Sequence, residues 1–192
     1  RSVLATPVGY YPYSTITGPD GLVYVGSDSA ILRFDGISGT PRPSSSHAGS
    51  VFADPGSYAF FLDLAFGPDG NLYAADHTGN RIQRFNGGTG GAMPSSGNSD
   101  AIFADLPAAP LGVEFGTDGN LYTVGHFDGI LVVDGVSGTV LGLVPGTDDR
   151  TYDDLAFTSD GKIAAISQNS TDSTLYLFDR VSSDKEVIGN FD

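Results

Sequence analysis

Residues 62–90 read LDLAFGPDGNLYAADHTGNRIQRFNGGTG, and the rest of the chain repeats this unit. The unit contains three short apolar runs, at residues 62–66, 71–75 and 81–85, which are separated by a Gly-Pro-Asp-Gly turn and a second polar turn. Short apolar runs joined by tight turns are typical of antiparallel β-strands. The unit therefore predicts a meander of three strands.

Three further copies of the unit are TGPDGLVYVGSDSAILRFDGISG from residue 17, FGTDGNLYTVGHFDGILVVDGVSG from residue 115 and FTSDGKIAAISQNSTDSTLYLFD from residue 157. The turn aspartates of the four copies are 49, 49 and 42 residues apart, and they are Asp20, Asp69, Asp118 and Asp160. Strand repeats of this length are typical of β-propellers, in which each repeat forms one blade of a disc.

Each copy is followed by a fourth, outer strand, and one more outer strand precedes the first copy. SVLA at residues 2–5 matches SVFA at residues 50–53, and the other outer strands are predicted at residues 101–104, 139–143 and 186–191. We therefore expect an all-β fold, a β-propeller with four blades of four antiparallel strands, in a single domain over residues 1–192. The repeats cover approximately residues 10–53, 62–104, 111–143 and 152–192, and residues 1–9 hold a surplus outer-type strand at the N-terminus.

The surplus strand, formed by Ser2, Val3, Leu4 and Ala5, has no place in a closed disc of four blades. Its backbone donors and acceptors need water or the edge of another sheet. The strand can fold against its own disc, complete a blade of a longer propeller or join two chains in an eight-bladed ring. It can also pair with the next copy, an arrangement that propagates into a filament. The partner we expect is therefore the chain itself, as a homo-oligomer or polymer.

The composition narrows the classes of function. The net charge is −14 with only 9 Lys and Arg residues, so a nucleic-acid partner is excluded by repulsion between like charges. No apolar run reaches the about 20 residues that a helix needs to cross a bilayer. The chain begins with Arg1 rather than Met and is rich in Gly, Ser, Thr and Asp. This start favours a secreted, extracellular product from which a signal peptide has been removed.

The second copy carries the most recognisable motifs, GPDGNLYAAD at residues 67–76 and NRIQRF at residues 80–85. The arrangement resembles the NHL-type and related six- to eight-bladed propeller repeats. The other copies keep the Asp-Gly turn but lose the aspartate at the end of the motif, where Gly26 and Gly125 stand. The resemblance implies a propeller fold that serves as a binding platform, as a scaffold or, in some members, as an enzyme.

Inner strands line the central channel of a propeller, and the alignment of the copies places carboxylates there. Asp63 and Asp154 occupy the same level in the second and fourth copies, and Glu114 lies two positions further along the third. Oxygen ligands of this kind suit a hard cation such as Ca²⁺, so the three residues predict a metal site. The alternative is that each carboxylate accepts backbone amides at the start of its strand or faces water in the channel.

Other polar residues of the copies have simpler explanations. The aspartates of the Asp-Gly turns supply the backbone geometry of a hairpin. Asp76, with Asn80 and Arg81, is expected to stabilise the turn that follows it through side-chain to backbone bonds. His77 and His126 occupy equivalent positions in adjacent copies, where a metal or acid–base pair would be of interest. No third ligand is evident, so we interpret them as surface histidines.

Six aromatic residues precede the inner strands of the first two blades, and they are Tyr10, Tyr11, Tyr13, Tyr58, Phe60 and Phe61. We expect them to pack between blades, although an exposed subset would suit a sugar or a neighbouring subunit. Asn169 begins an Asn-Ser-Thr sequon, and the Pro- and Ser-rich segments at residues 36–49 and 87–100 could accept O-linked sugars. These features predict a glycoprotein.

The main hypothesis is therefore a non-enzymatic extracellular module that acts in structure or interaction and assembles through its surplus strand. Two alternatives stay open. One is a metal-dependent propeller enzyme, lactonase- or lyase-like, with Asp63, Glu114 and Asp154 at the mouth of the channel. The other is a platform that binds a glycan or a protein through the long segments of the first two blades.

Overall fold

The computed structural model describes residues 9–168, 173–182 and 184–191, and these residues form sixteen strands in four sheets. The first sheet contains β1 (Pro12–Thr17), β2 (Leu22–Ser27), β3 (Ile31–Asp35) and β4 (Val51–Ala53). The second contains β5 (Phe61–Phe66), β6 (Leu72–Asp76), β7 (Arg81–Phe85) and β8 (Ile102–Asp105). The third contains β9 (Pro110–Phe115), β10 (Leu121–Gly125), β11 (Phe127–Val133) and β12 (Val140–Leu143). The fourth contains β13 (Asp154–Phe157), β14 (Ile163–Gln168), β15 (Ser173–Phe178) and β16 (Lys185–Asn190).

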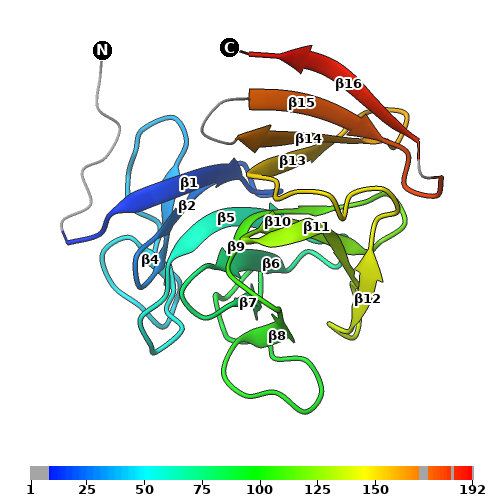
Figure 1. Cartoon of the computed structure of the whole chain (residues 1–192). Coiled ribbons are helices and arrows are strands. Elements are labelled where there is room, and N and C mark those ends of the chain that lie inside the picture. Colours follow the sequence, from blue (N-terminus) through cyan, green and yellow to red (C-terminus); the bar gives the residue numbers. More distant parts are fainter. Residues whose placement is uncertain (1–8, 169–172, 183, 192) are drawn as a thin grey trace.

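Within each sheet, strands that are adjacent in the chain pair antiparallel. Figure 1 shows the sheets arranged around a common centre, with the inner strands β1, β5, β9 and β13 closest to it. β1 contacts β5, β5 contacts β9, and β9 contacts β13. The predicted architecture, four blades of four antiparallel strands, is therefore confirmed.

Three strands begin two or three residues before the apolar runs that predict them, which are residues 14–17, 112–115 and 130–133. They are β1, which starts at Pro12, β9, which starts at Pro110, and β11, which starts at Phe127, because pairing continues in each place beyond a shift in register. A bulge inserts one unpaired residue and turns the side chains beyond it to the other face, which a simple alternation cannot reveal.

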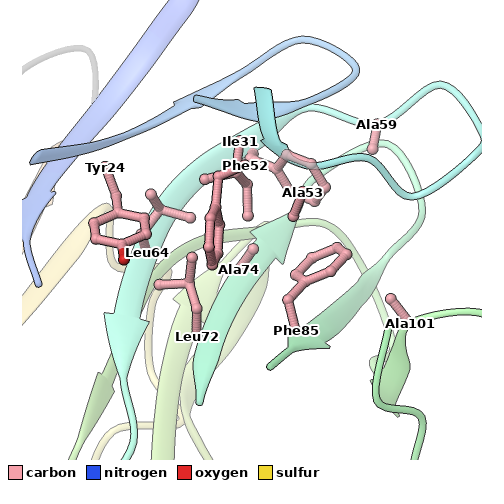
Figure 2. Close-up of a cluster of buried hydrophobic side chains, with 11 residues drawn as sticks. Tyr24, Ile31, Phe52, Ala53, Ala59, Leu64, Leu72, Ala74, Phe85 and Ala101 are labelled. Atoms are coloured by element: carbon pink, nitrogen blue, oxygen red, sulfur yellow. The ribbon is translucent and has the colours of Figure 1, made fainter. Parts of the chain in front are cut away.

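Three apolar cores hold neighbouring sheets together face to face. Figure 2 shows the first core, in which Tyr24, Ile31 and Phe52 of the first sheet meet Leu64 and Leu72 of the second. Fully burying a side chain of this size stabilises the fold by about 1.5–3 kcal/mol. Packing between sheets is thus the main force that fixes the inner strands and the side chains they carry.

One aromatic pair recurs in all three cores. A tyrosine of one sheet meets edge-on the phenylalanine that ends the inner strand of the next. The ring centroids are 5.0 Å apart for Tyr24 and Phe66, 4.7 Å for Tyr73 and Phe115, and 5.0 Å for Tyr122 and Phe157. Such pairs contribute about 0.5–1.5 kcal/mol beyond the area they bury.

The same tyrosines are bonded to the Asp-Gly turns of their own sheets. The Tyr73 hydroxyl donates to Oδ2 of Asp69 at 3.0 Å, and Oδ1 of Asp69 accepts the amide of Asn71. Asp20 and Asp118 make the equivalent bonds in the first and third sheets. These three aspartates therefore serve the turns, as the sequence predicts.

The series of aromatic pairs does not continue beyond the first sheet or beyond the fourth. The position of Tyr73 is taken by Ala164 in the fourth sheet, and that of Phe66 is taken by Thr17 in the first. Among the residues that the structure describes, no apolar cluster joins the fourth sheet to the first. Within the described part of the chain, the outer face of the fourth sheet therefore lacks an apolar cover, and Ile166 on it is 45% exposed.

Arginine side chains hold the Pro- and Ser-rich segments against the sheets. The guanidinium carbon of Arg33 lies 4.4 Å from the ring centroid of Phe52, and its Nε donates to the carbonyl oxygen of Arg42 at 2.7 Å. Arg84 stacks in the same way on Phe103 at 4.6 Å and bonds a carbonyl of the second segment. Both segments are therefore fixed rather than loose.

Two sequence predictions fall outside the described residues, namely the surplus strand Ser2–Ala5 and the glycosylation site at Asn169. Within the described part of the chain, no helix is long and apolar enough to cross a membrane.

Candidate functional site

A pocket of about 430 Å³ opens where the four inner strands converge. Its wall includes Ile16 of β1, Asp63 of β5, Glu114 of β9, and Asp154 and Ala156 of β13. We call it the axial pocket. The three carboxylates that the sequence singles out therefore line one cavity, although they come from three different sheets.

Asp63 is the most constrained of the three. Its Oδ1 accepts the amide of Leu64 at 2.8 Å, and its Oδ2 accepts the amide of Val113 in the next sheet at 2.9 Å. Burial raises the pKa of Asp63 to about 6. The two amide bonds lower this pKa, and the nearby charges of Asp154 and Glu114 raise it by a smaller amount. Asp63 can therefore hold or release a proton close to neutral pH.

Glu114 repeats the link one sheet further on. Its Oε2 accepts the amide of Phe157 in the fourth sheet at 2.9 Å, and burial raises its pKa, with Asp154 adding to the increase. Asp154 accepts the amide of the adjacent Leu155 at 2.8 Å and is exposed to solvent. The pocket thus contains two carboxyls bonded across sheets and one that is bonded only within its own strand.

The predicted metal site requires carboxylate oxygens that are free to bind an ion. Among the described residues, no three His, Cys, Asp or Glu side chains are grouped closely enough to hold one ion. Both oxygens of Asp63 and one of Glu114 already accept backbone amides. The bonds agree with the alternative that these carboxylates accept backbone amides, and the predicted Ca²⁺ site at Asp63, Glu114 and Asp154 stays a prediction.

Asp76 and the histidines lie at the turns between the second and third strands. Asp76 is fully buried, accepts the amide of Gly79 at 3.0 Å and pairs with Arg81 at 2.8 Å, so it stabilises its turn as predicted. The rings of His77 and His126 meet edge-on with centroids 5.1 Å apart. Burial lowers the pKa of His77, and the neighbouring His126 lowers it further.

The structure corrects the expectation that the six aromatic residues pack between blades. Phe61 is fully buried, but Tyr11, Tyr13 and Tyr58 are 73%, 47% and 60% exposed. Tyr13 and Tyr58 both contact the ring of Phe60, at 5.4 and 5.0 Å between centroids. The register shift beside Tyr13 is one local reason, because it changes the direction of side chains at the start of β1.

No family model and no curated protein matches the chain, so NHL-type membership stays a prediction. Solved structures match it over most of its length. Virginiamycin B lyase from Staphylococcus aureus aligns with a TM-score of 0.64 and 15% identity, over 95% of this chain and 57% of the lyase. A gluconolactonase from Xanthomonas campestris aligns at 0.58 and 19%, over 83% of this chain and 56% of the other. The WD40 propeller domain of Doa1 aligns at 0.54 and 12%, over 80% and 47%.

These structures correct one prediction of the sequence. The sequence favoured a module that is not an enzyme, whereas the lyase and the gluconolactonase are named as enzymes and share this arrangement of sheets. The expectation of a non-enzyme is therefore overturned. The chain spans 57% and 56% of the lengths of these two chains, and the property it shares with them is the β-propeller fold.

Proposed function

We propose that this chain contributes four blades to a propeller enzyme that opens small cyclic esters, that is lactones, in the axial pocket. The observation that carries the proposal is Asp63, a carboxyl held by two backbone amides on the pocket wall with a pKa of about 6. Acid–base catalysts work best when their pKa lies near the working pH. The similarity to a gluconolactonase supports the class of substrate.

In the proposed reaction, Asp154 and Asp63 act as base and acid. The exposed Asp154 carboxylate takes a proton from water, and the resulting hydroxide attacks the lactone carbonyl carbon. When the ring C–O bond breaks, the leaving oxygen takes the proton held by Asp63, and the proton on Asp154 then returns to Asp63 through solvent, which restores both groups. One water is consumed, and the product is an open-chain hydroxy acid. The two carboxyls differ in burial, which is the usual way in which acid and base roles are separated.

The charge of the chain favours turnover in this direction. The substrate is neutral and the product carries a carboxylate, whereas the protein has a net charge of −14. Repulsion between like charges then disfavours retention of the product.

The test is hydrolysis of glucono-δ-lactone and related sugar lactones by the full chain, followed by proton release, with Asp63→Asn and Asp154→Asn as variants. We expect each variant to lose about a hundredfold in kcat/KM, and the wild-type rate to fall as pH rises beyond about 6, because Asp63 then loses its proton. Asp148→Asn is the control, since Asp148 is exposed and lies outside the pocket. The proposal is wrong if the wild-type chain opens no lactone, or if Asp63→Asn keeps both rate and pH profile.

Self-association is a second candidate, carried by the uncovered outer face of the fourth sheet. Ala156 and Ile166 on this face are exposed, and Leu175 and Leu177 are half-buried. We propose that a second copy covers it, in line with the expected homo-oligomer. Light scattering should give a mass above that of the monomer, and Ile166→Asp should restore the monomer. The control is Val181→Asp, because Val181 is 89% exposed and lies outside the sheets. A monomeric wild-type chain at high concentration rejects this candidate.

A further inference from the structure

Four aromatic side chains gather on the surface at the start of the inner strands of the first two sheets. We call Tyr11, Tyr13, Tyr58 and Phe60 the aromatic cluster. The rings of Tyr13 and Tyr58 each meet the ring of Phe60 edge to face, and Tyr11 is joined to the first sheet through Asp28. None of the four residues lines the axial pocket. We propose that the aromatic cluster is a binding site for the pyranose rings of a neutral oligosaccharide.

The rings of the aromatic cluster are exposed to water, which costs stability. Tyr11, Tyr13 and Tyr58 are 73%, 47% and 60% exposed, whereas Tyr24 and Tyr73, on the second strands of the first two sheets, are fully buried. Leaving such a ring in water forgoes the stabilisation that burial gives to the other tyrosines. Adjacent exposed aromatic side chains are a feature of surfaces that bind ligands or partners.

Hydrogen bonds fix the backbone of the aromatic cluster in the absence of a ligand. The amide of Tyr11 donates to Oδ1 of Asp28 at 2.6 Å, and the amide of Asp28 donates back to the carbonyl of Tyr11 at 3.1 Å. The amide of Phe60 donates to Oγ1 of Thr78 at 3.1 Å, and its carbonyl accepts the amide of His77 at 2.9 Å. Preorganisation of this kind reduces the entropy that binding must overcome.

The aromatic cluster has the chemistry that recognises a sugar ring. Ring faces carry partial negative charge and attract the weakly positive C–H groups of an apolar surface, and a pyranose presents such a surface together with hydroxyl groups. The hydroxyls of Tyr11, Tyr13 and Tyr58 and the carboxylate of Asp28 can bond those groups. Burial raises the pKa of Tyr13, and the nearby Asp28, Tyr58 and Tyr11 raise it further. These polar groups therefore lie near one another.

The negative charge of the protein favours a neutral ligand. The net charge of −14 repels acidic sugars and other anions. No Lys or Arg lies within the aromatic cluster or among its hydrogen-bond partners named above. A neutral oligosaccharide therefore fits better than a charged one. The inference stands apart from the proposed lactone chemistry, because it uses different residues and a different surface.

The experiment is calorimetric titration of the full chain with cellohexaose, maltohexaose and xylohexaose. We expect at least one of them to bind, with a Kd on the order of 0.1–1 mM, as befits a shallow site with few contacts. Tyr13→Ala and Tyr58→Ala should each weaken binding about tenfold, since a stacked ring contributes on the order of 1 kcal/mol. Tyr13→Phe should retain most of the affinity, because it keeps the ring.

Matched controls separate this site from other surfaces and from the axial pocket. Phe191→Ala removes a ring that is 63% exposed but lies at the end of the fourth sheet, and it should leave binding unchanged. Asp63→Asn should also leave binding unchanged, so failure of the lactone proposal would not affect this result. All variants are checked for an unchanged thermal midpoint. Absence of binding to all three sugars, binding that survives Tyr13→Ala with Tyr58→Ala, or tighter binding of tetramethylammonium at the same residues overturns the inference.

Discussion

The carboxylate of Asp63 on β5 accepts the amide proton of Val113 on β9 at 2.9 Å, and so joins the second sheet to the third at the wall of the axial pocket. Glu114 joins the third sheet to the fourth in the same way. The residues that could do chemistry in this molecule are therefore also residues that hold its sheets in place.

Stability should fall as pH rises through the titration of Asp63. Its pKa is raised from the usual 3.8 to about 6 in the folded state, so the folded chain binds the proton more tightly than the unfolded chain does. The resulting stabilisation is complete below about pH 4 and is lost as pH rises through about 6, by at most about 3 kcal/mol. Urea unfolding between pH 4 and 8 should show this fall. Asp63→Asn should remove that part of the pH dependence, and an unchanged profile in the variant would contradict the assignment.

His77 should have the opposite effect at acid pH. Burial lowers the pKa of His77 in the folded state, and His126 lowers it further. The unfolded chain then binds the proton more tightly, so stability falls as pH drops below about 6.5. His77→Gln should reduce this loss in urea unfolding, and NMR titration of the His77 ring signals should give a pKa below the usual value. His47→Gln is the control, because His47 lies in another segment.

The recurring tyrosines should contribute more to the stability of the fold than a tyrosine placed at the equivalent position of the fourth sheet. Tyr73 is fully buried, contacts Phe115 at 4.7 Å and bonds Asp69. We expect Tyr73→Ala to destabilise the fold by about 3–5 kcal/mol through the cavity it leaves, and Tyr73→Phe by about 1 kcal/mol through the lost hydrogen bond. Ala164→Tyr places the same ring on the uncovered face of the fourth sheet and should change stability by less than about 1 kcal/mol. Equal effects at the two positions would argue against the three-core arrangement.

Two glycines with positive φ separate backbone strain from collision. Gly90 has φ +72°, and a Cβ there would lie 1.9 Å from the carbonyl oxygen of Phe52, whereas Gly97 has φ +91° and open space around its Cβ position. Gly97→Ala should cost about 1 kcal/mol, from the left-handed backbone alone. Gly90→Ala should cost clearly more, about 3 kcal/mol or above, because the segment around Gly90 must move away from Phe52 of β4. Thermal unfolding of the two variants side by side measures the difference.

The repeat made the fold readable from the sequence. Four Asp-Gly turns at regular spacing locate four blades, and aligning the copies places Asp63, Glu114 and Asp154 on inner strands that meet at one pocket. The alignment works because each copy solves the same packing problem with the same alternation of side chains.

Other features could not be predicted from the sequence, because they depend on contacts between copies. That the carboxylates bond amides of the next sheet depends on how neighbouring inner strands are staggered, which no single copy encodes. The exposure of Tyr11, Tyr13 and Tyr58 was missed because aromatic side chains are buried in most folds and the register shift beside Tyr13 leaves no mark in the alternation. One signal was present but unused: Thr17 and Ala164 interrupt the Phe and Tyr series that the other copies keep.

That interruption bears on how such a protein could be lengthened by duplication. A second copy of the sheet that contains Tyr73 and Phe66, inserted directly after the original, would find a ring partner on each side, because Tyr73 of the original would meet the new Phe66 and the new Tyr73 would meet Phe115. The same segment appended beyond the fourth sheet would face Ala164 and lack one of those partners. Growth by internal duplication is thus compatible with the existing side chains, whereas growth at the outer face of the fourth sheet requires a new contact.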